Sequence, residues 1–357
     1  MINSRLPLID AAGSHYDIGL TIGRAVPERI AGMIRNYQAL FANLPGFKST
    51  WAQAIVNAHK YLPFIEEALP QYVDELRGMA AGSSVAFDDL LLCNCFEELT
   101  DDMLFEKCTT VAFTPEHTTD VHVLLGHTED WLPLDREWQY VVRVRPDDEP
   151  AFISPVYGGL LPNIGFNASG LAQCINTVYP DDARVGIPRL FIGRHVLAAP
   201  RLGVAIERAL HSRRAAGYNH VLADDSGELY NVETTAKHGD LLYAHDGYLT
   251  HANNYLSPRL RDHEVDDIIG ANLRVNRAAR LAKQALARGP IDRGGVQAII
   301  SDHNNAPYSI CAHAEDVPVR DQTVTISAYV IDLTARTLWY CYGNPCKGEF
   351  VPITLEG

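Results

Sequence analysis

Hydrophobic residues recur at a helical spacing through the first third of the chain. An interval of four residues places one apolar series, from position 18 to position 34, on a single helix face. Further helical patterns cover 51–82 and 88–104, and the first is interrupted at Pro63 and Pro70, where proline at a first turn begins a new helix. Residues 1–107 are therefore predicted to form a mostly helical segment after a short initial strand.

Beyond residue 107 the hydrophobic period shortens to two, which is typical of β-strands. Helices are expected on each side of Pro200 and over 272–288 and 296–301. The predicted strands cover 121–127, 140–145, 151–153, two strands within 164–172, 220–223, 229–233, 240–244, 248–251, 308–311, 323–332 and 337–342. Helices followed by hairpin strands indicate an α+β fold of layered antiparallel sheets, with no linker that divides the chain into separate domains.

Composition limits the classes of protein to consider. The chain has 357 residues, 47% of them hydrophobic, and a net charge of −14, which argues against nucleic acid or an anionic membrane surface as a partner. It has no apolar run long enough for a transmembrane helix, and its start does not resemble a secretory signal. Seven cysteines without regular spacing predict reduced thiols in a cytoplasmic protein.

Several common catalytic motifs are missing from the sequence. It contains no phosphate-binding glycine loop, no dinucleotide fingerprint, no paired-histidine zinc helix and no nucleophile-elbow serine. The pairs Cys93 with Cys95 and Cys341 with Cys346 do not have the spacing of zinc ligands. No metal and no other cofactor are therefore expected.

Cys108 lies where the helical pattern gives way to strands. If the bond between Lys107 and Cys108 were cut, Cys108 would carry a thiol nucleophile and an α-amine, whose pKa of about 7.7–8.0 suits a general base near neutral pH. A buried cysteine at the first position of an inner strand fits the same pattern. The stretch alone leaves both interpretations open.

Polar residues at two other strand ends could complete such a site. Asp130 could bind the new α-amine, although a solvated loop carboxylate is the plainer interpretation. Asn253 could donate a hydrogen bond to an oxyanion, or it could cap a turn.

A stripe of basic residues follows one predicted helix. It could meet the phosphates of a coenzyme A thioester, but a solvated helix face is the preferred interpretation. Its members are Arg274, Arg277, Arg280 and Lys283.

Seven stretches, in this order, resemble the family of acyl-coenzyme A:isopenicillin N acyltransferases, which are self-processing N-terminal-nucleophile hydrolases. They are YDIG at 16–19, ELRGMAAG at 75–82, CTT at 108–110, GHTED at 126–130, GFNASG at 165–170, HAN at 251–253 and NAPYSIC at 305–311. The resemblance implies a four-layer αββα sandwich of two antiparallel sheets. It also implies self-cleavage into 1–107 and 108–357, which together would remain one associated domain.

The resemblance further implies roles for individual residues. Cys108 would be the nucleophile, Asp130 would orient its amine, Asn253 would stabilise the oxyanion and Thr110 would be a polar neighbour of the thiol. The residues expected to contact the substrate are Phe113, Trp131 and Ser309. The penicillin-forming enzymes have glycine where this chain has Lys107, a difference that could slow or alter self-cleavage. They have a Gln-Asn-Trp-Asp run in place of residues 127–130, which changes the pocket wall and argues against the antibiotic substrate.

These features predict an enzyme that hydrolyses a small acyl amide through an acyl-enzyme on Cys108, or that transfers the acyl group from an amide or thioester. Two rival functions remain. One is a metal-dependent amidohydrolase that uses histidines such as His122, His127 and His251. The other is an uncleaved, non-enzymatic binding protein of the same fold.

Overall fold

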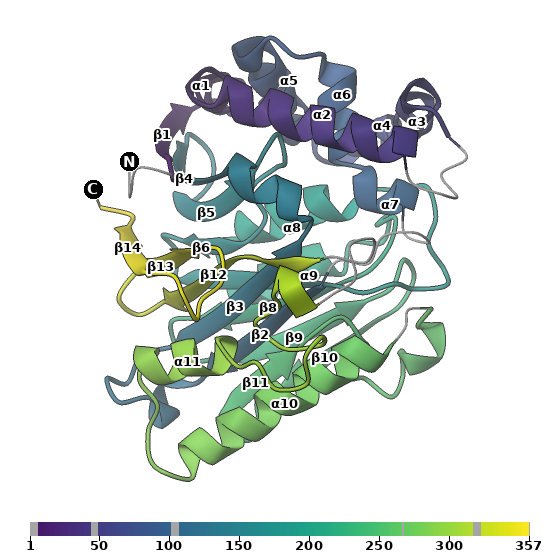
Figure 1. Ribbon diagram of the computed structural model, residues 1–357. Helices are drawn as coiled ribbons and strands as arrows, with labels where there is room; N and C mark the ends of the chain where they lie inside the picture. Colours follow the sequence, from purple (N-terminus) through teal and green to yellow (C-terminus); the bar gives the residue numbers. More distant parts are fainter. Residues whose placement is uncertain (1–5, 44–48, 101–106, 266–267, 317–322, 357) are drawn as a thin grey trace.

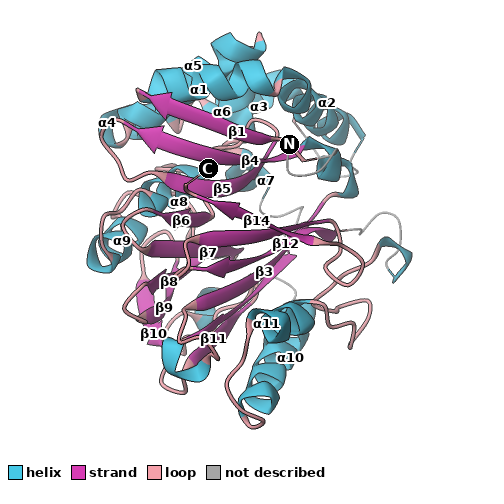
Figure 2. Ribbon diagram, turned by 90° about the vertical axis from the view of Figure 1, so that its left-hand side faces the viewer, coloured by secondary structure: helices cyan, strands magenta, loops and turns pink. Residues whose placement is uncertain are grey.

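The computed structural model describes residues 6–43, 49–100, 107–265, 268–316 and 323–356. Two stacked β-sheets form its centre, and helices cover their outer faces (Figures 1 and 2). The predicted four-layer αββα arrangement is therefore confirmed. Among the described helices, none combines the length and the apolar character needed to cross a bilayer.

Among the described residues, the first sheet has eight strands. In spatial order they are β1 (Leu8–Gly13), β4 (Gln139–Pro146), β5 (Phe152–Tyr157), β6 (Gly165–Asn167), β7 (Leu171–Thr177), β8 (Tyr218–Asp224), β9 (Leu229–Thr234) and β10 (Gly239–Tyr243). β1 runs parallel to β4, and the other neighbours are antiparallel. The β1–β4 pair is an exception to the predicted antiparallel sheets, because the chain returns to this sheet as β4 only after α1 to α7 and two strands of the other sheet.

In the part of the chain that the structure describes, the second sheet has six strands, all antiparallel to their neighbours. Its order is β11 (Tyr248–His251), β2 (Lys107–Phe113), β3 (Leu124–Trp131), β12 (Val324–Asp332), β13 (Thr337–Tyr342) and β14 (Phe350–Thr354). The strand predicted at 308–311 is wrong, because this segment forms a turn in which the Ser309 hydroxyl donates to the Cys311 carbonyl at 2.9 Å. β14 was not predicted.

Helices from two parts of the chain cover the first sheet. They are α1 (His15–Ala25), α2 (Pro27–Asn43), α3 (Trp51–Ala58), α4 (Leu62–Ala68), α5 (Pro70–Ser83), α6 (Phe87–Cys93), α7 (Phe96–Thr100), α8 (Arg189–Leu197) and α9 (Leu202–Ala209). The continuous helix expected over 88–104 is two short helices, because Asn94 turns its side chain back to the Leu90 carbonyl and across to the Gly159 carbonyl. Residues 101–104 lie outside the described residues.

The second sheet is covered by α10 (Ile268–Leu286) and α11 (Arg293–Ile300), as Figure 1 shows. Short 3₁₀ helices lie in loops of the described residues: η1 (Pro115–His117), η2 (Pro133–Trp138), η3 (Arg261–His263) and η4 (Ala314–Asp316).

Alternation along the strands produces three hydrophobic layers. In β4, Val142 faces the first helical layer, whereas Val141 faces the space between the sheets. In β2, Ala112 faces that same space, whereas Val111 and Phe113 pack among residues of α10 and α11. This period of two fixes the direction of every side chain on β2, including Cys108 at its start.

Two of the sequence stretches that carry the family resemblance meet where α1 crosses α5. A Cβ atom at Gly78 would lie 2.0 Å from the Tyr16 carbonyl oxygen, and one at Gly19 would lie 1.9 Å from the Glu75 carbonyl oxygen. The helix backbones therefore touch directly, which only glycine permits. Beside this crossing Glu75 is fully buried and accepts hydrogen bonds from Arg194 at 3.1 Å.

Candidate active site

Cys108 lies at the beginning of β2, between β11 and β3 in the second sheet. Cys108 and Ala112 are four residues apart on the strand and therefore lie on the same face, so the Cys108 side chain points into the space between the sheets. Thr109 lies on the opposite face of β2 and contacts Arg274 on α10. The thiol therefore faces the first sheet, while the neighbouring backbone faces a buried arginine.

Two amide groups from different sheets converge on the sulfur of Cys108. Asn176 Nδ2, on β7, lies 3.1 Å from Sγ, and Asn253 Nδ2, just after β11, lies 3.2 Å from it. The thiol donates to the Ile175 carbonyl at 3.5 Å. Burial and the nearby Glu129 carboxylate raise the pKa of Cys108 to about 12, so the thiol needs a base before it can attack a carbonyl.

The other end of the Asn253 amide holds the backbone of Cys108. Asn253 Oδ1 accepts a hydrogen bond from the Cys108 N–H at 3.0 Å. One asparagine thus contacts both the thiol and the nitrogen that would become the α-amine after cleavage.

Arg274 supports this arrangement from α10. Its Nη2 donates to Asn253 Oδ1 at 2.9 Å, and its Nη1 donates to the Cys108 carbonyl and to Thr109 Oγ1. The side chain is only 3% exposed, so the predicted solvated face is wrong for Arg274. Arg277 forms an ion pair with Asp302, and Arg280 is exposed.

Asp130 lies opposite Lys107 in the pairing of β2 with β3. Its Oδ1 accepts from the Thr325 hydroxyl at 2.5 Å, and its Oδ2 has no hydrogen-bond partner among the described residues. Burial raises the pKa of Asp130 to about 6, although the positive charge of Arg274 opposes this shift. A buried carboxylate oxygen is thus available beside the predicted cleavage site.

Thr110 orients one of the amides. Its hydroxyl lies 2.8 Å from His127 Nδ1 and donates to Asn176 Oδ1 at 3.3 Å. This contact turns the NH₂ group of Asn176 toward the sulfur. Burial lowers the pKa of His127 to about 3, so its ring is neutral at physiological pH.

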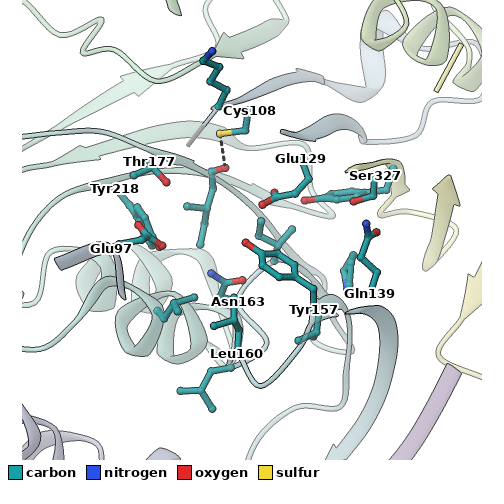
Figure 3. A pocket seen from close by; sticks show the side chains of 18 of the residues that line it. Glu97, Cys108, Glu129, Gln139, Tyr157, Leu160, Asn163, Thr177, Tyr218 and Ser327 are labelled. Atoms are coloured by element: carbon teal, nitrogen blue, oxygen red, sulfur yellow. Dashed lines mark hydrogen bonds between the residues drawn. The ribbon is translucent and has the colours of Figure 1, made fainter. Parts of the chain in front are cut away.

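A pocket opens beside Cys108 between the two sheets (Figure 3). Its polar lining includes Glu97, Lys107, Glu129, Gln139, Tyr157, Asn163, Thr177, Tyr218, Ser327, Tyr329 and Tyr340. Glu129 is paired with Cys108 across the strands and has a side chain that is 19% exposed. Burial raises its pKa to about 7. Glu97 lies 3.3 Å from Arg189, so its charge is already compensated.

None of the three residues predicted to contact the substrate lines this pocket. Phe113 is at the far end of β2 and packs against Tyr248. The Trp131 indole donates to the Tyr37 hydroxyl at 3.3 Å within the helical layer. Ser309 lies in the turn that replaces the predicted strand at 308–311.

The three histidines of the rival metal hydrolase bind separate partners. His122 Nδ1 lies 2.9 Å from Asp332, His251 Nε2 lies 2.8 Å from Glu233, and His127 contacts Thr110. Within the described residues, the group with metal-ligand spacing contains none of the three.

Comparison with known proteins decides the family. The sequence profile of the acyl-coenzyme A:6-aminopenicillanic acid acyl-transferases matches residues 117–347, more than half of the chain. The chain belongs to this family. The β-alanyl-dopamine/carcinine hydrolase of Drosophila melanogaster is 26% identical over 381 residues, which cover 96% of this chain and 94% of that relative. The predicted class of enzyme, a hydrolase or acyltransferase, is thereby confirmed.

Solved structures support the fold of this family member. Crystal structures of two variants of the conjugated bile acid hydrolase from Clostridium perfringens match with a TM-score of 0.50 and 14% identity. The matches cover 69% of this chain and 97% and 96% of those chains. At this identity the likeness concerns the fold alone. The family profile begins after Cys108, so the role of this residue depends on the geometry described above.

Proposed function

We propose that this family member is a self-processing amidase that uses Cys108 as an N-terminal nucleophile. One observation carries the proposal: the two ends of the Asn253 amide contact the thiol, at 3.2 Å, and the backbone nitrogen, at 3.0 Å, of the same cysteine. These are the two groups that such an enzyme uses as nucleophile and general base.

Maturation would begin at the bond between Lys107 and Cys108. The thiol adds to the Lys107 carbonyl carbon, the C–N bond breaks, and the departing nitrogen takes the thiol proton. Water then hydrolyses the resulting thioester, which leaves a carboxylate on Lys107 and both a free thiol and an α-amine on Cys108. The buried carboxylate of Asp130 lies opposite Lys107 and would form an ion pair with the new amine whenever the amine is protonated.

In turnover, the α-amine takes the proton of the Cys108 thiol and the thiolate attacks the substrate carbonyl. The amine product leaves with that proton, and water hydrolyses the acyl-enzyme. Asn176 and Asn253 direct their NH₂ groups toward the region next to the sulfur, where the oxyanion would form. Loss of one such donor typically lowers the rate by about 10²–10³-fold.

We further propose a substrate with a positively charged acyl group. β-Alanyl-dopamine, which names the fly relative, is an amide whose acyl part ends in an ammonium group. In this chain Glu129 lies in the pocket next to Cys108, and its pKa of about 7 would fall once an ammonium neutralised it. A short aminoacyl amide would therefore place its ammonium against Glu129 and its carbonyl against the sulfur.

Acyl transfer is the second candidate, and the name of the matched family favours it. The two reactions share the acyl-enzyme and differ in whether water or an amine resolves it. Product analysis with a β-alanyl amide, and with an acyl-coenzyme A thioester plus an amine acceptor, separates them.

The test of maturation is denaturing mass spectrometry of the purified full chain, with N-terminal sequencing. Wild type should give pieces 1–107 and 108–357, whereas Cys108→Ala should remain one inactive chain. Cys174→Ala, which removes another buried thiol of the space between the sheets, is the matched control and should still be cleaved. Scission or turnover in Cys108→Ala would contradict the proposal, and an intact, inactive wild type would favour a binding protein.

The test of the substrate is a comparison of β-alanyl and propionyl amides of the same amine. Wild type should prefer the β-alanyl amide, and Glu129→Gln should lose that preference while it retains activity on the propionyl amide. Equal activity of wild type on both amides would exclude the role of Glu129 without affecting that of Cys108.

A further inference from the structure

Two histidines and two cysteines meet outside the active-site pocket, in the loops at one end of the second sheet. His303, Cys311 and His313 lie between α11 and β12, and Cys346 lies between β13 and β14. One ligand atom from each residue lies within 4.8 Å of the others. No other group of this kind occurs among the residues that the structure describes.

Four of the six distances between ligand atoms in this Cys₂His₂ cluster are close to the edges of a small tetrahedron, and the other two, from His303 to the sulfurs, are within 4.8 Å. The two sulfurs are 3.7 Å apart, and His313 Nε2 lies 3.5 Å from Cys311 Sγ and 3.3 Å from Cys346 Sγ. The Nε2 atoms of the two histidines are 3.1 Å apart. Zinc bonds of about 2.3 Å to sulfur and about 2.0–2.1 Å to nitrogen would give edges of about 3.8, 3.5 and 3.3 Å in the same order.

The surroundings of the cluster are those of metal ligands. His313 directs its Nδ1 toward Glu315, 3.5 Å away, and a carboxylate in this position fixes the tautomer that binds a metal through Nε2. Asn344 Nδ2 lies 3.6 Å from Cys311 Sγ and donates to the Ala312 carbonyl at 2.8 Å. An amide donor beside the sulfur stabilises a thiolate.

We propose that these four residues bind one zinc ion as a structural site. Two thiolates and two imidazoles complete a tetrahedron and leave no position for a substrate, which is the arrangement of structural rather than catalytic zinc. This inference departs from the sequence-based expectation of no metal. On sequence spacing, Cys346 was considered only together with Cys341, whereas the cluster pairs Cys346 with the distant Cys311.

The site would fix the loop that supports Asp130. Ala312, between two of the ligands, donates to Thr325 Oγ1 at 2.9 Å and accepts from the Thr325 N–H at 3.1 Å. The Thr325 hydroxyl in turn donates to Asp130 at 2.5 Å. The metal would therefore act as a positioning element for a carboxylate of the proposed active site.

Metal analysis of the purified full chain by inductively coupled plasma mass spectrometry tests the proposal. Wild type should carry one zinc per chain after dialysis. Cys346→Ser and His303→Ala should each lower that content at least tenfold, and both replace exposed residues, so the fold is expected to survive. Cys341→Ser is the matched control, because Cys341 is close in the chain but outside the cluster, and it should retain the metal.

Cobalt(II) provides a second readout that does not depend on activity or on the variants. Wild type loaded with cobalt should show the visible bands of a tetrahedral ion and a thiolate charge-transfer band, and Cys346→Ser should lose both. Three results would each overturn the site: a wild type that binds no metal, metal content unchanged in both variants, or a Cys311–Cys346 disulfide in the intact mass.

Discussion

Arg274 fixes the position of Asn253 through a single hydrogen bond, in which Nη2 donates to the side-chain oxygen at 2.9 Å. That oxygen is the one that also accepts the Cys108 N–H, so the arginine determines which way the Asn253 amide faces. If the amide turned around, its NH₂ group would point away from the sulfur. The geometry around the proposed nucleophile thus depends on a residue of the outer helical layer.

Arg274→Lys should therefore lower kcat about 100-fold, because lysine cannot bind Asn253, Thr109 and the Cys108 carbonyl together. Initial rates on a small aminoacyl amide measure the effect. Arg280→Lys, an exposed change on the same helix, controls for the substitution. If Arg274→Lys kept the kcat of wild type, Arg274 would not be needed to position the proposed active site.

Asn176→Ala should lower kcat by about 10²–10³-fold and leave KM nearly unchanged, since the oxyanion exists only after attack on the carbonyl. Thr110→Val keeps the amide but removes the hydroxyl that orients it, so its loss should be smaller, about tenfold. Steady-state kinetics on the matured enzyme measure kcat and KM of both variants. A change confined to KM would instead indicate that Asn176 binds the ground state of the substrate.

Glu129→Gln should change how stability depends on pH. Burial raises the pKa of Glu129 from 4.5 to about 7, so the folded state holds its proton more tightly than the unfolded chain does. The stability that this tightly held proton contributes to the fold is fully present below pH 4.5 and is lost as the pH rises to about 7. The free energy of unfolding of the variant, relative to wild type, should thus rise by about 1–3 kcal/mol over this interval.

Urea denaturation at a series of pH values checks this expectation, with Cys108→Ala as the background so that every sample is one chain. Glu207→Gln, an exposed change on α9, controls for the altered net charge. A relative stability that falls with rising pH would show that the sign is wrong.

Gly78→Ala should destabilise the fold by about 3 kcal/mol or more, because the new Cβ would lie 2.0 Å from the Tyr16 carbonyl oxygen and would force α1 and α5 apart. Gly203→Ala is the matched control on α9. Its Cβ would meet nothing within 4 Å, so alanine should stabilise that helix by up to about 1 kcal/mol. Thermal unfolding of the two variants should shift in opposite directions.

The sequence predicted the helical layer well because proline and glycine mark its boundaries locally. α4 and α5 begin next to Pro63 and Pro70, as expected, and two helices lie on either side of Pro200. The strand predicted at 308–311 failed because a short, mostly apolar run such as Tyr-Ser-Ile-Cys also suits a buried turn. Nothing local distinguishes these cases, since a strand depends on a partner elsewhere in the chain.

Within the site, Cys108 and Asn253 could be selected because each lies at the end of a predicted strand and in a stretch that resembles the family, CTT at 108–110 and HAN at 251–253. Asn176 was missed because its closeness to Cys108 depends on how one sheet stacks on the other, which sequence spacing does not contain. For Arg274 there was a usable signal. It shares a helix face with Ala271, Val275 and Ala278, all of them buried, and the charges at 277, 280 and 283 obscured this pattern.

β1 precedes Lys107 in the chain, yet its six residues pair with Val141 to Pro146 of β4, which follow Cys108. The same interleaving holds for the helices α1 to α7, whose apolar faces share one core with strands from the later part of the chain. Scission after residue 107 would thus create two polypeptides that remain folded together as one molecule. Neither polypeptide could be exchanged for a fresh copy without dismantling the whole molecule, so maturation would be a step that each molecule takes once.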